Sequence, residues 1–221
     1  PCGIGPPGST RRCRRPVDAS PVAEPDPVVA GVVLAAGASR RMGQAKLLLR
    51  WSGVSLLRRA AEAATAACRQ VVVVVGPDPD RMRAELGGLP VEVVANPGYA
   101  EGIASSLRCG LRAVRDAPAV LVVLADQPAV TAQHLRRLVE AYRRTGAPVV
   151  AASYAGTVGV PAVFSRQLFP ELLALTGDVG ARGVIDRHRD EAVLVPVPEA
   201  AVDVDTPEDW ARVTGARGGD A

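Results

Sequence analysis

The chain has 221 residues, of which 48% are hydrophobic and 22% are charged. This composition is close to that of globular proteins and excludes a chain that is disordered or collagen-like throughout. The length predicts one domain with tails. The net charge of +3 and the aromatic content of 3% argue against nucleic acid and against an anionic membrane as partners, because both need a basic surface and single strands also need stacking platforms.

The tails and the cysteines narrow the class of protein further. Residues 1–27 are rich in Pro, Gly, Ser and Arg without apolar periodicity, so we expect a disordered N-terminal tail, one domain at 28–215 and a flexible C-terminal tail at 216–221. No apolar run has the length of a membrane span and no signal-peptide core is found, which predicts a cytoplasmic protein. The four cysteines lack zinc-site spacing, and Cys68 and Cys109 are expected to pack as small buried side chains.

After the tail, short β-branched runs alternate with amphipathic stretches. The runs predict strands at 28–35, 70–75, 91–95, 119–124, 148–153 and 192–197. The amphipathic stretches predict helices at 55–68, 80–86, 103–115, 131–145, 166–175 and 207–213. Because strands and helices alternate, and because two of the strands are apolar throughout, we expect an α/β fold with a mostly parallel central sheet covered by helices. Ligands of such sheets bind outside the carboxyl ends of the strands.

The first predicted strand runs into the segment 34–46, Leu-Ala-Ala-Gly-Ala-Ser-Arg-Arg-Met-Gly-Gln-Ala-Lys. Its small residues let backbone N–H groups approach an anion, and its basic side chains add positive charge. The spacing is not that of a Walker A loop, and Ser39 and Met42 stand where a dinucleotide fingerprint needs glycine. Of the 26 basic residues, Lys46 is the only lysine, and we expect its ammonium to be exposed and to serve a site that a guanidinium cannot fill.

Two aspartates are candidate metal ligands. An apolar strand ending at Leu124 runs into Ala125 and Asp126, and a carboxylate there suits Mg²⁺, which binds one or two carboxylates together with substrate phosphates. The alternative role is a helix cap, although Thr131 is closer to the next helix. Asp205 precedes Thr206 and Pro207, which have the residue types of an N-cap and a first helical position.

The segment 34–46 resembles the signature Leu-Ala-Ala/Gly-Gly-x-x-x-Arg-Met-Gly-x-x-Lys of the MobA-like nucleotidyltransferases. The resemblance implies a three-layer, Rossmann-like nucleotidyltransferase fold. It also implies that backbone groups of Leu34, Ala35, Ala36 and Gly37 hold the base. In the same loop it implies that Ser39, Arg41, Gly43 and Lys46 contact the nucleotide, with Arg41 and Lys46 on the triphosphate.

Further segments resemble the same family in the same order. The stretch 96–107 resembles the family's Asn-Pro…Gly…Ser-Leu stretch, which implies that Asn96, Gly102 and Ser106 lie beside the base and ribose. The alternative is an ordinary glycine-rich loop before a helix. Asp126 resembles the family's magnesium aspartate, which makes Arg41, Lys46 and Asp126 the implied catalytic residues. Asp205 is the implied second metal contact, with Asp203 as the fallback.

The resemblance is greatest to the molybdenum cofactor cytidylyltransferases. Their second-substrate segments resemble 159–164 and 177–182, except that Val160 stands where they often have His. Leu-Ala-Ala-Gly at 34–37 is similar to the cytidylyl-transferring members, which implies CTP rather than GTP. The implied reaction is Mg²⁺-dependent transfer of CMP to the terminal phosphate of molybdenum cofactor, with a molybdoenzyme or its maturation factor as partner. The alternatives are an NAD(P)H- or flavin-dependent oxidoreductase and a non-catalytic molybdenum cofactor carrier.

Overall fold

The computed structural model describes residues 28–37 and 45–215, so the two predicted tails lie outside it. The strands of its main sheet are β1 (Val29–Ala35), β4 (Val71–Val75), β5 (Glu92–Ala95), β6 (Ala119–Leu124), β7 (Val149–Tyr154), β8 (Thr157–Ser165) and β9 (Val193–Pro196). The helices are α1 (Leu56–Thr65), α2 (Pro79–Glu85), α3 (Ile103–Ala113), α4 (Ala132–Thr145), α5 (Phe169–Leu173), α6 (Arg182–Arg187) and α7 (Pro207–Gly215). Short 3₁₀ turns are η1 (Lys46–Leu48), η2 (Tyr99–Glu101), η3 (Arg166–Leu168), η4 (Arg189–Glu191) and η5 (Pro198–Ala201).

The seven strands lie in the order β5-β4-β1-β6-β8-β7-β9. β5, β4, β1 and β6 are mutually parallel, and so are β7 and β9, whereas β8 runs antiparallel to β6 and β7. Every residue of β1 is buried, as expected for a central strand that helices cover on both faces. The carboxyl ends of β1 and β6 therefore lie side by side, which is where the fold places a ligand.

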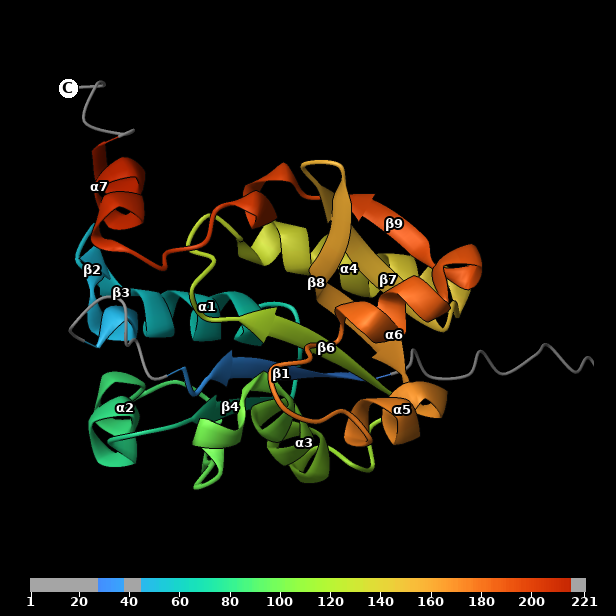
Figure 1. Cartoon of the computed structure of the whole chain (residues 1–221), viewed down its shortest axis with the longest axis horizontal. Coiled ribbons are helices and arrows are strands. Elements are labelled where there is room, and N and C mark those ends of the chain that lie inside the picture. The colour runs from blue at the N-terminus through green and yellow to red at the C-terminus, as the bar shows by residue number, and fades with distance from the viewer. Residues whose placement is uncertain (1–27, 38–44, 216–221) are drawn as a thin grey trace, which may run out of the picture.

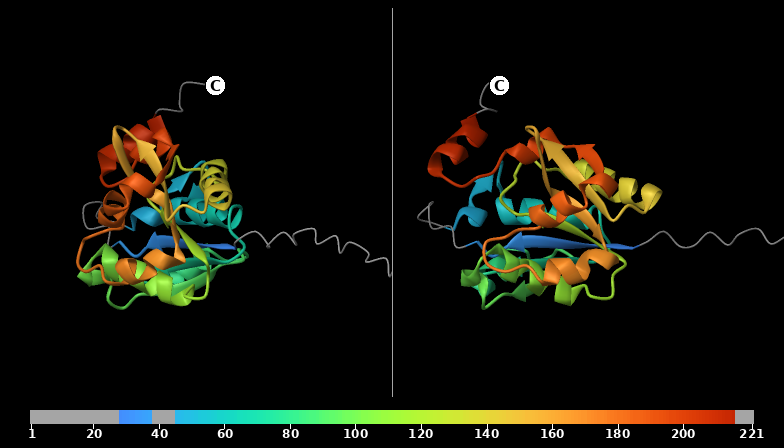
Figure 2. Two further views of the ribbon diagram at one scale, coloured as in Figure 1. Left: turned by 90° about the vertical axis from the view of Figure 1, so that its right-hand side faces the viewer. Right: turned by 45° about the vertical axis from the view of Figure 1, so that its right-hand side comes forward.

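The molecule has three layers (Figure 1). Side chains from α1 and α4 pack on one face of the sheet and those from α3, α5 and α6 on the other, and the turned views keep the two layers apart (Figure 2). In α3, a Cβ at Gly110 would clash with the side chain of Val32 in β1. The absence of a side chain at Gly110 therefore allows the helix to pack closely on the sheet. The predicted fold class is confirmed.

The structure differs from the sequence prediction at β8, which was not expected as a strand. Pro161 lacks the N–H that a sheet ladder needs, so the segment does not have the pattern of an internal strand. Between β7 and β8 the register shifts at Ala151/Ala152, which pair with Ala162 and Gly159. Val160 and Pro161 thus fall in a bulge and take no part in that ladder.

A third, smaller cluster docks the C-terminal helix. β2 (Arg50–Trp51) and β3 (Val54–Ser55) form a separate two-stranded sheet. Leu56, Val204 and Val213 are buried together there, with Trp51 and Trp210 packed against them. Figure 1 shows α7 beside β2 and β3. Helix α7 is thereby held against β2 and the start of α1.

Two further predictions concern individual features. Cys68 is buried, as expected, and loss of hydration raises the pKa of its thiol to about 12, whereas Cys109 is only partly buried. In the described part of the chain, no helix is both long enough and apolar enough to cross a membrane.

Candidate active site

A cleft of about 580 Å³ opens at the carboxyl ends of β1 and β6. Eight of the residues predicted for the site from the sequence line it, namely Leu34, Ala36, Gly37, Lys46, Gly102, Ser106, Asp126 and Asp205. The remaining lining residues were not predicted individually, although all but Leu124 fall in the predicted segments 96–107 and 177–182. They are Tyr99, Ala100, Ile103, Leu124 and Asp178. Ser39, Arg41 and Gly43 lie outside the described residues, so their predicted roles stay predictions.

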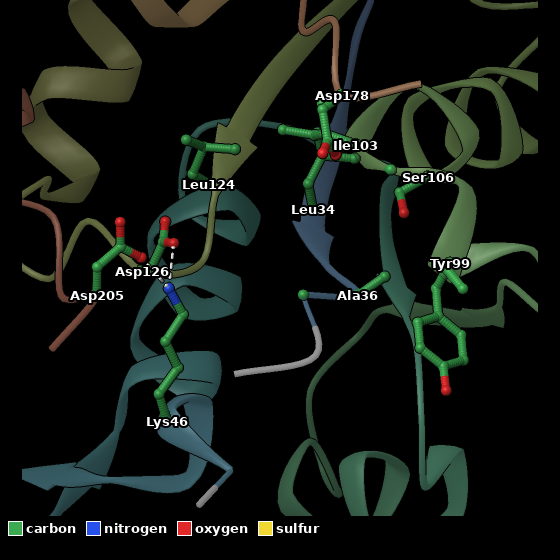
Figure 3. A pocket seen from close by; sticks show the side chains of 13 residues that line it. Leu34, Ala36, Lys46, Tyr99, Ile103, Ser106, Leu124, Asp126, Asp178 and Asp205 are labelled. Atoms are coloured by element: carbon green, nitrogen blue, oxygen red, sulfur yellow. Dashed lines mark hydrogen bonds and ion pairs between the residues drawn. The ribbon is translucent and has the colours of Figure 1, made fainter. Parts of the chain in front are cut away.

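One end of the cleft holds a lysine between two carboxylates. Lys46 Nζ donates to Asp126 Oδ2 at 2.7 Å and to Asp205 Oδ1 at 2.8 Å (Figure 3). Lys46 is 7% exposed, so the expectation of an exposed side chain is wrong. Burial opposes its charge, but the charges and hydrogen bonds of Asp126 and Asp205 outweigh burial and raise the pKa of Lys46. The ammonium is therefore firmly protonated.

Asp126 reaches this position because it lies two residues beyond Leu124, the last residue of β6. The alternative role of helix cap belongs to Thr131, which precedes α4 and whose backbone N–H donates to His134 Nδ1 at 3.2 Å. The backbone oxygen of Asp126 accepts from Val204 N at 3.0 Å. This bond ties the C-terminal segment to the end of β6 and brings Asp205 next to Asp126.

Asp205 is aimed at Lys46 by the cap of α7. Thr206 Oγ1 accepts from Asp209 N at 3.2 Å, and Asp209 Oδ2 accepts from Thr206 N at 3.0 Å, a reciprocal cap at a helix start. Hydrogen bonds from the backbone N–H of Asp205 and from Thr206 lower the pKa of Asp209. Because Thr206 and Asp209 do the capping, the Asp205 carboxylate is left to face the cleft.

The donor set suits a hard divalent cation. Two carboxylate oxygens already surround one positive charge, and Mg²⁺ in nucleotide sites takes one or two carboxylates plus phosphate oxygens. Among residues 28–37 and 45–215, no cluster of three or more His, Cys, Asp or Glu could hold a metal by itself. Loss of hydration is the main cause that raises the pKa of Asp203 to about 6, and the negative charge of Asp126 is the second cause. Asp203 nevertheless keeps an exposed surface.

The opposite end of the cleft is formed by the end of β1 and the start of α3. Ala36 lies between the Lys46 group on one side and Ser106 and Tyr99 on the other (Figure 3). Ala36 is 5% exposed and packs with the α3 side of the sheet. Ala35 packs with the core on the other face and does not line the cleft, so only its backbone is placed to contribute.

Asn96 serves the site indirectly. It is 6% exposed and is absent from the cleft lining. Its Nδ2 donates to Ser105 Oγ at 2.9 Å and to Ser106 Oγ at 3.1 Å, and its Oδ1 accepts from Gly98 N at 3.0 Å. These bonds hold the loop before α3 and position Ser106, which does line the cleft.

Asp178 enters the site by a close approach of two loops. Gly102 has φ 109°, and a Cβ there would come within 2.5 Å of Asp178 Oδ1 and of the Gly177 backbone. Ala104 N also donates to Gly177 O at 3.1 Å. The segment 177–182 was singled out in the sequence, but no pattern indicated that it folds over the start of α3.

The comparisons with known proteins agree with this geometry. Residues 31–192 match the family model described as MobA-like NTP transferase domain. Nicotine blue oxidoreductase of Paenarthrobacter nicotinovorans is 31% identical over 85% of this chain and 97% of that protein. Purine catabolism protein PucB of Bacillus subtilis is 31% identical over 86% and 98%, and molybdenum cofactor cytidylyltransferase of Escherichia coli is 24% identical over 81% and 92%.

Solved structures share the fold of this chain. Rv0371c from Mycobacterium tuberculosis H37Rv has a TM-score of 0.72 at 33% identity, covering 85% of this chain and 98% of that chain. The same protein has been solved in complex with manganese, with a TM-score of 0.70. A nucleotidyl transferase from Methanothermobacter has a TM-score of 0.71 at 25% identity, covering 86% and 97%.

Proposed function

The chain belongs to the MobA-like NTP transferase family, and we propose that it transfers a CMP group from CTP to the terminal phosphate of molybdenum cofactor. The domain that carries this activity is proposed to be residues 28–215, flanked by tails at 1–27 and 216–221. The recipient of the product is proposed to be a molybdoenzyme or its maturation factor.

One observation carries the proposal. Asp126 and Asp205 both contact the Lys46 ammonium at one end of a cleft that is also lined by Leu34, Ala36 and Gly37. A nucleoside triphosphate needs this combination, because its base requires a close backbone approach while its phosphates require a metal-binding and cationic end.

The proposed reaction needs positioning more than proton transfer. An oxygen of the acceptor's phosphate forms a bond to the α-phosphorus of CTP, while the bond from that phosphorus to the oxygen bridging to the β-phosphate breaks and pyrophosphate leaves. A phosphate monoester has a second pKa of about 6, so the attacking oxygen already carries charge at neutral pH. The chain's contribution is to align the two substrates and offset their charge.

The residues divide this work. Asp126 and Asp205 are proposed to hold Mg²⁺, which would neutralise negative charge on the substrate phosphates. Nucleotidyltransferases of this family generally depend on a divalent metal, and the related Rv0371c has been solved with manganese. Lys46 and Arg41 are proposed to contact the triphosphate, and Ser106 and Gly102 to lie beside the ribose and base.

A redox role is the second candidate, because nicotine blue oxidoreductase is 31% identical over most of this chain. The sequence offers no dinucleotide fingerprint for it, since Ser39 and Met42 stand at two of the glycine positions. Spectral titration with NAD(P)H and flavin tests this role directly.

The decisive experiment is a nucleotide panel. The full chain is incubated with CTP, GTP, ATP or UTP, molybdenum cofactor and Mg²⁺ or Mn²⁺, and pyrophosphate is measured. We expect release with CTP that requires both the acceptor and the metal. If none of the nucleotides supports pyrophosphate release and a cofactor-dependent spectral change is seen, the redox role is favoured. If molybdenum cofactor binds without pyrophosphate release, a carrier role is favoured.

A further inference from the structure

The segment that carries Asp205 runs over the surface with few buried residues. Between η5 and α7, Asp203 and Asp205 are exposed, whereas Val204 is fully buried. Ala200, at the end of η5, is also fully buried. A segment with few buried contacts opens locally at little cost in free energy. The two buried residues are therefore the points that fix where Asp205 lies.

Both points are held by consecutive residues of the loop after β6. Val204 N donates to Asp126 O at 3.0 Å, and Gln127 Nε2 donates to Ala200 O at 2.9 Å. The first bond is made by backbone atoms alone, whereas the second depends on the Gln127 side chain. Gln127 thus supplies the one of these two tethers that a substitution can remove.

Gln127 is buried although its side chain is polar. It is 4% exposed, and its Oε1 is buried and accepts no hydrogen bond from the described residues. A buried acceptor without a partner costs free energy, and an apolar side chain of the same length would fill the space without this cost. Packing alone therefore does not account for Gln127, and its N–H groups are the part of the side chain that makes contacts.

The Gln127 amide also lies beside the acidic end of the cleft. Loss of hydration and the negative charge of Asp126 raise the pKa of Asp203, and a hydrogen bond from the Gln127 side chain opposes this rise. An amide nitrogen carries two N–H groups. The Gln127 side chain can therefore serve Ala200 and Asp203 together, so it contacts the 200–205 segment on both sides of its exposed part.

We infer that Gln127 is a positioning residue, which holds the Asp205 carboxylate beside Asp126 by fixing the 200–205 segment. Figure 3 shows the two carboxylates next to each other at Lys46. Because the backbone bond at Val204 would remain, loss of the Gln127 tether should let the segment pivot rather than detach. The inference rests on the proposed function for the metal that the two carboxylates would bind, and it adds a residue that is not itself a proposed metal ligand.

The test removes the tether and compares the result with a variant that loses a similar number of hydrogen bonds elsewhere. Gln127→Met keeps the length of the side chain and removes its N–H groups. Thr145→Val is the matched control, because the Thr145 hydroxyl donates to Ala141 O at 2.8 Å and accepts from Ala147 N at 3.3 Å at the C-terminal end of α4. If Gln127→Met does not fold, Gln127→Asn takes its place, since it keeps the amide but shortens its reach by one methylene.

Two properties are measured for every variant. Amide hydrogen exchange of the 200–205 segment in the metal-free protein reports the tether itself, and electron paramagnetic resonance of free Mn²⁺ gives the Kd for this metal. We expect Gln127→Met to speed exchange at Val204 N and to raise the Kd by about 10- to 100-fold, the range for residues that orient metal ligands. Thr145→Val should match the wild type in both properties.

A double variant shows whether the effect on the metal passes through Asp205. Asp205→Asn should raise the Kd for Mn²⁺ by itself. If Gln127 acts by placing this carboxylate, adding Gln127→Met to Asp205→Asn should raise the Kd no further. A further rise as large as that caused by Gln127→Met alone would overturn the inference, because the tether would then act on another group.

The outcomes separate this inference from the proposed function. Unchanged hydrogen exchange in Gln127→Met overturns the inference, and so does an unchanged Kd when Asp205→Asn raises the Kd. If the wild type binds no Mn²⁺, or if Asp205→Asn leaves the Kd unchanged, the proposed metal site fails. Hydrogen exchange of the 200–205 segment then decides by itself whether Gln127 holds this segment.

Discussion

The Lys46 ammonium lies between the two carboxylates that are proposed to hold a divalent cation. It is 2.7 Å from Asp126 and 2.8 Å from Asp205, and all three side chains line the cleft. A buried ammonium and a metal ion cannot occupy one position, so under the proposed function the metal would displace the Lys46 ammonium, which would then be available to the substrate phosphates. Charge balance in the cleft thereby favours the binding of metal and nucleotide together.

Replacing Lys46 with Gln should separate its two roles. Without metal, Asp126 and Asp205 would repel each other, so we expect Tm to fall by at least about 2–4 °C, which corresponds to about 1 kcal/mol in a chain of this size. Mn²⁺ alone should then raise Tm of the variant more than that of the wild type. Turnover should fall by at least about 100-fold, as for one preorganised electrostatic contact.

The control for Lys46 is Arg83→Gln, which breaks the exposed Arg83–Asp80 pair at 2.8 Å. Exposed pairs contribute little, so its Tm and its metal response should match the wild type. Differential scanning fluorimetry with and without Mn²⁺ gives both values. A variant of Lys46 whose response to metal equals that of the wild type would contradict the shared position.

Asp126→Asn tests the proposed metal ligand while keeping the shape of the side chain. Turnover should fall by about 100-fold or more, whereas CTP binding without metal should change little, since the lost charge acts through the metal. Because Thr131 precedes α4 as its N-cap, we expect no loss of helix stability. Asp186→Asn, a surface carboxylate in α6, is the control, and a variant with reduced Tm but normal specific activity would remove Asp126 from the metal site.

Ala36→Gly tests the proposed choice of base. The Ala36 methyl lies in the cleft between the two ends of the site, so we expect it to favour CTP over GTP by about 1–3 kcal/mol, the discrimination available from one small steric difference. The variant should relax this preference without abolishing transfer. The measurement is kcat/KM for both nucleotides in both proteins, and an unchanged ratio would show that another group selects the base.

At this scale the sequence predicted which residues meet but not how they meet. The order of motifs was enough to place Lys46, Asp126 and Asp205 in one cleft. It could not show that the ammonium bridges the carboxylates, because that contact depends on the Val204–Asp126 hydrogen bond between distant segments. The prediction that Asn96 lies beside the nucleotide stays a prediction. In the structure its Nδ2 donates to Ser105 and Ser106, and no local pattern indicates these partners.

Among the elements, α3 begins after Gly102, which packs closely against the loop that carries Gly177 and Asp178. Gly102 adopts φ 109° with ψ −179°, a conformation that is essentially restricted to glycine. The loop that carries Asp178 packs against it so closely that a Cβ would meet backbone atoms of Gly177. Backbone cannot move aside as a flexible side chain can, so this contact sets the distance between the loop and α3.

Gly102→Ala should therefore displace the 177–182 loop. We expect a stability loss above the roughly 1 kcal/mol typical of glycine-specific positions, together with weaker CTP binding. Gly146→Ala is the comparison, because Gly146 lies in the left-handed region at φ 61° and has nothing within 4 Å of its Cβ position, so it reports the cost of a positive φ without a steric contact. Equal losses in the two variants, with CTP binding intact, would show that the contact does not shape the cleft.

The elements themselves were largely predictable, and the exceptions have physical reasons. The continuous apolar runs that form β1, β4 and β6 were predicted correctly as strands. β8 carries Gly159 and Pro161, which read as loop residues because the sequence cannot show that a bulge removes Pro161 from the β7–β8 ladder. α6 is six residues long and too short for helical periodicity to register.

For the whole molecule, the site exists only when both ends of the domain are in place. Lys46 and Asp205 are 159 residues apart in sequence. Asp205 directly precedes Thr206 and Pro207 at the start of α7, and α7 is held by the Trp51, Trp210 and Val213 cluster. The docking of α7 therefore controls whether the second carboxylate reaches the cleft.

Trp210→Ala should loosen α7 without touching the site. Because Trp210 is only partly buried, we expect a moderate loss of Tm and a fraction of molecules in which Asp205 has left Lys46. Under the proposed function metal and nucleotide bind the docked state, so saturating Mn²⁺ and CTP should restore the docked population. The apparent Kd for Mn²⁺ should rise, while kcat at saturating metal should stay near the wild-type value.

Thr214→Ala, on the exposed part of the same helix, should change neither. Electron paramagnetic resonance of free Mn²⁺ measures the Kd, and a fall in kcat with an unchanged Kd would mean that α7 acts on turnover by a route other than the position of Asp205.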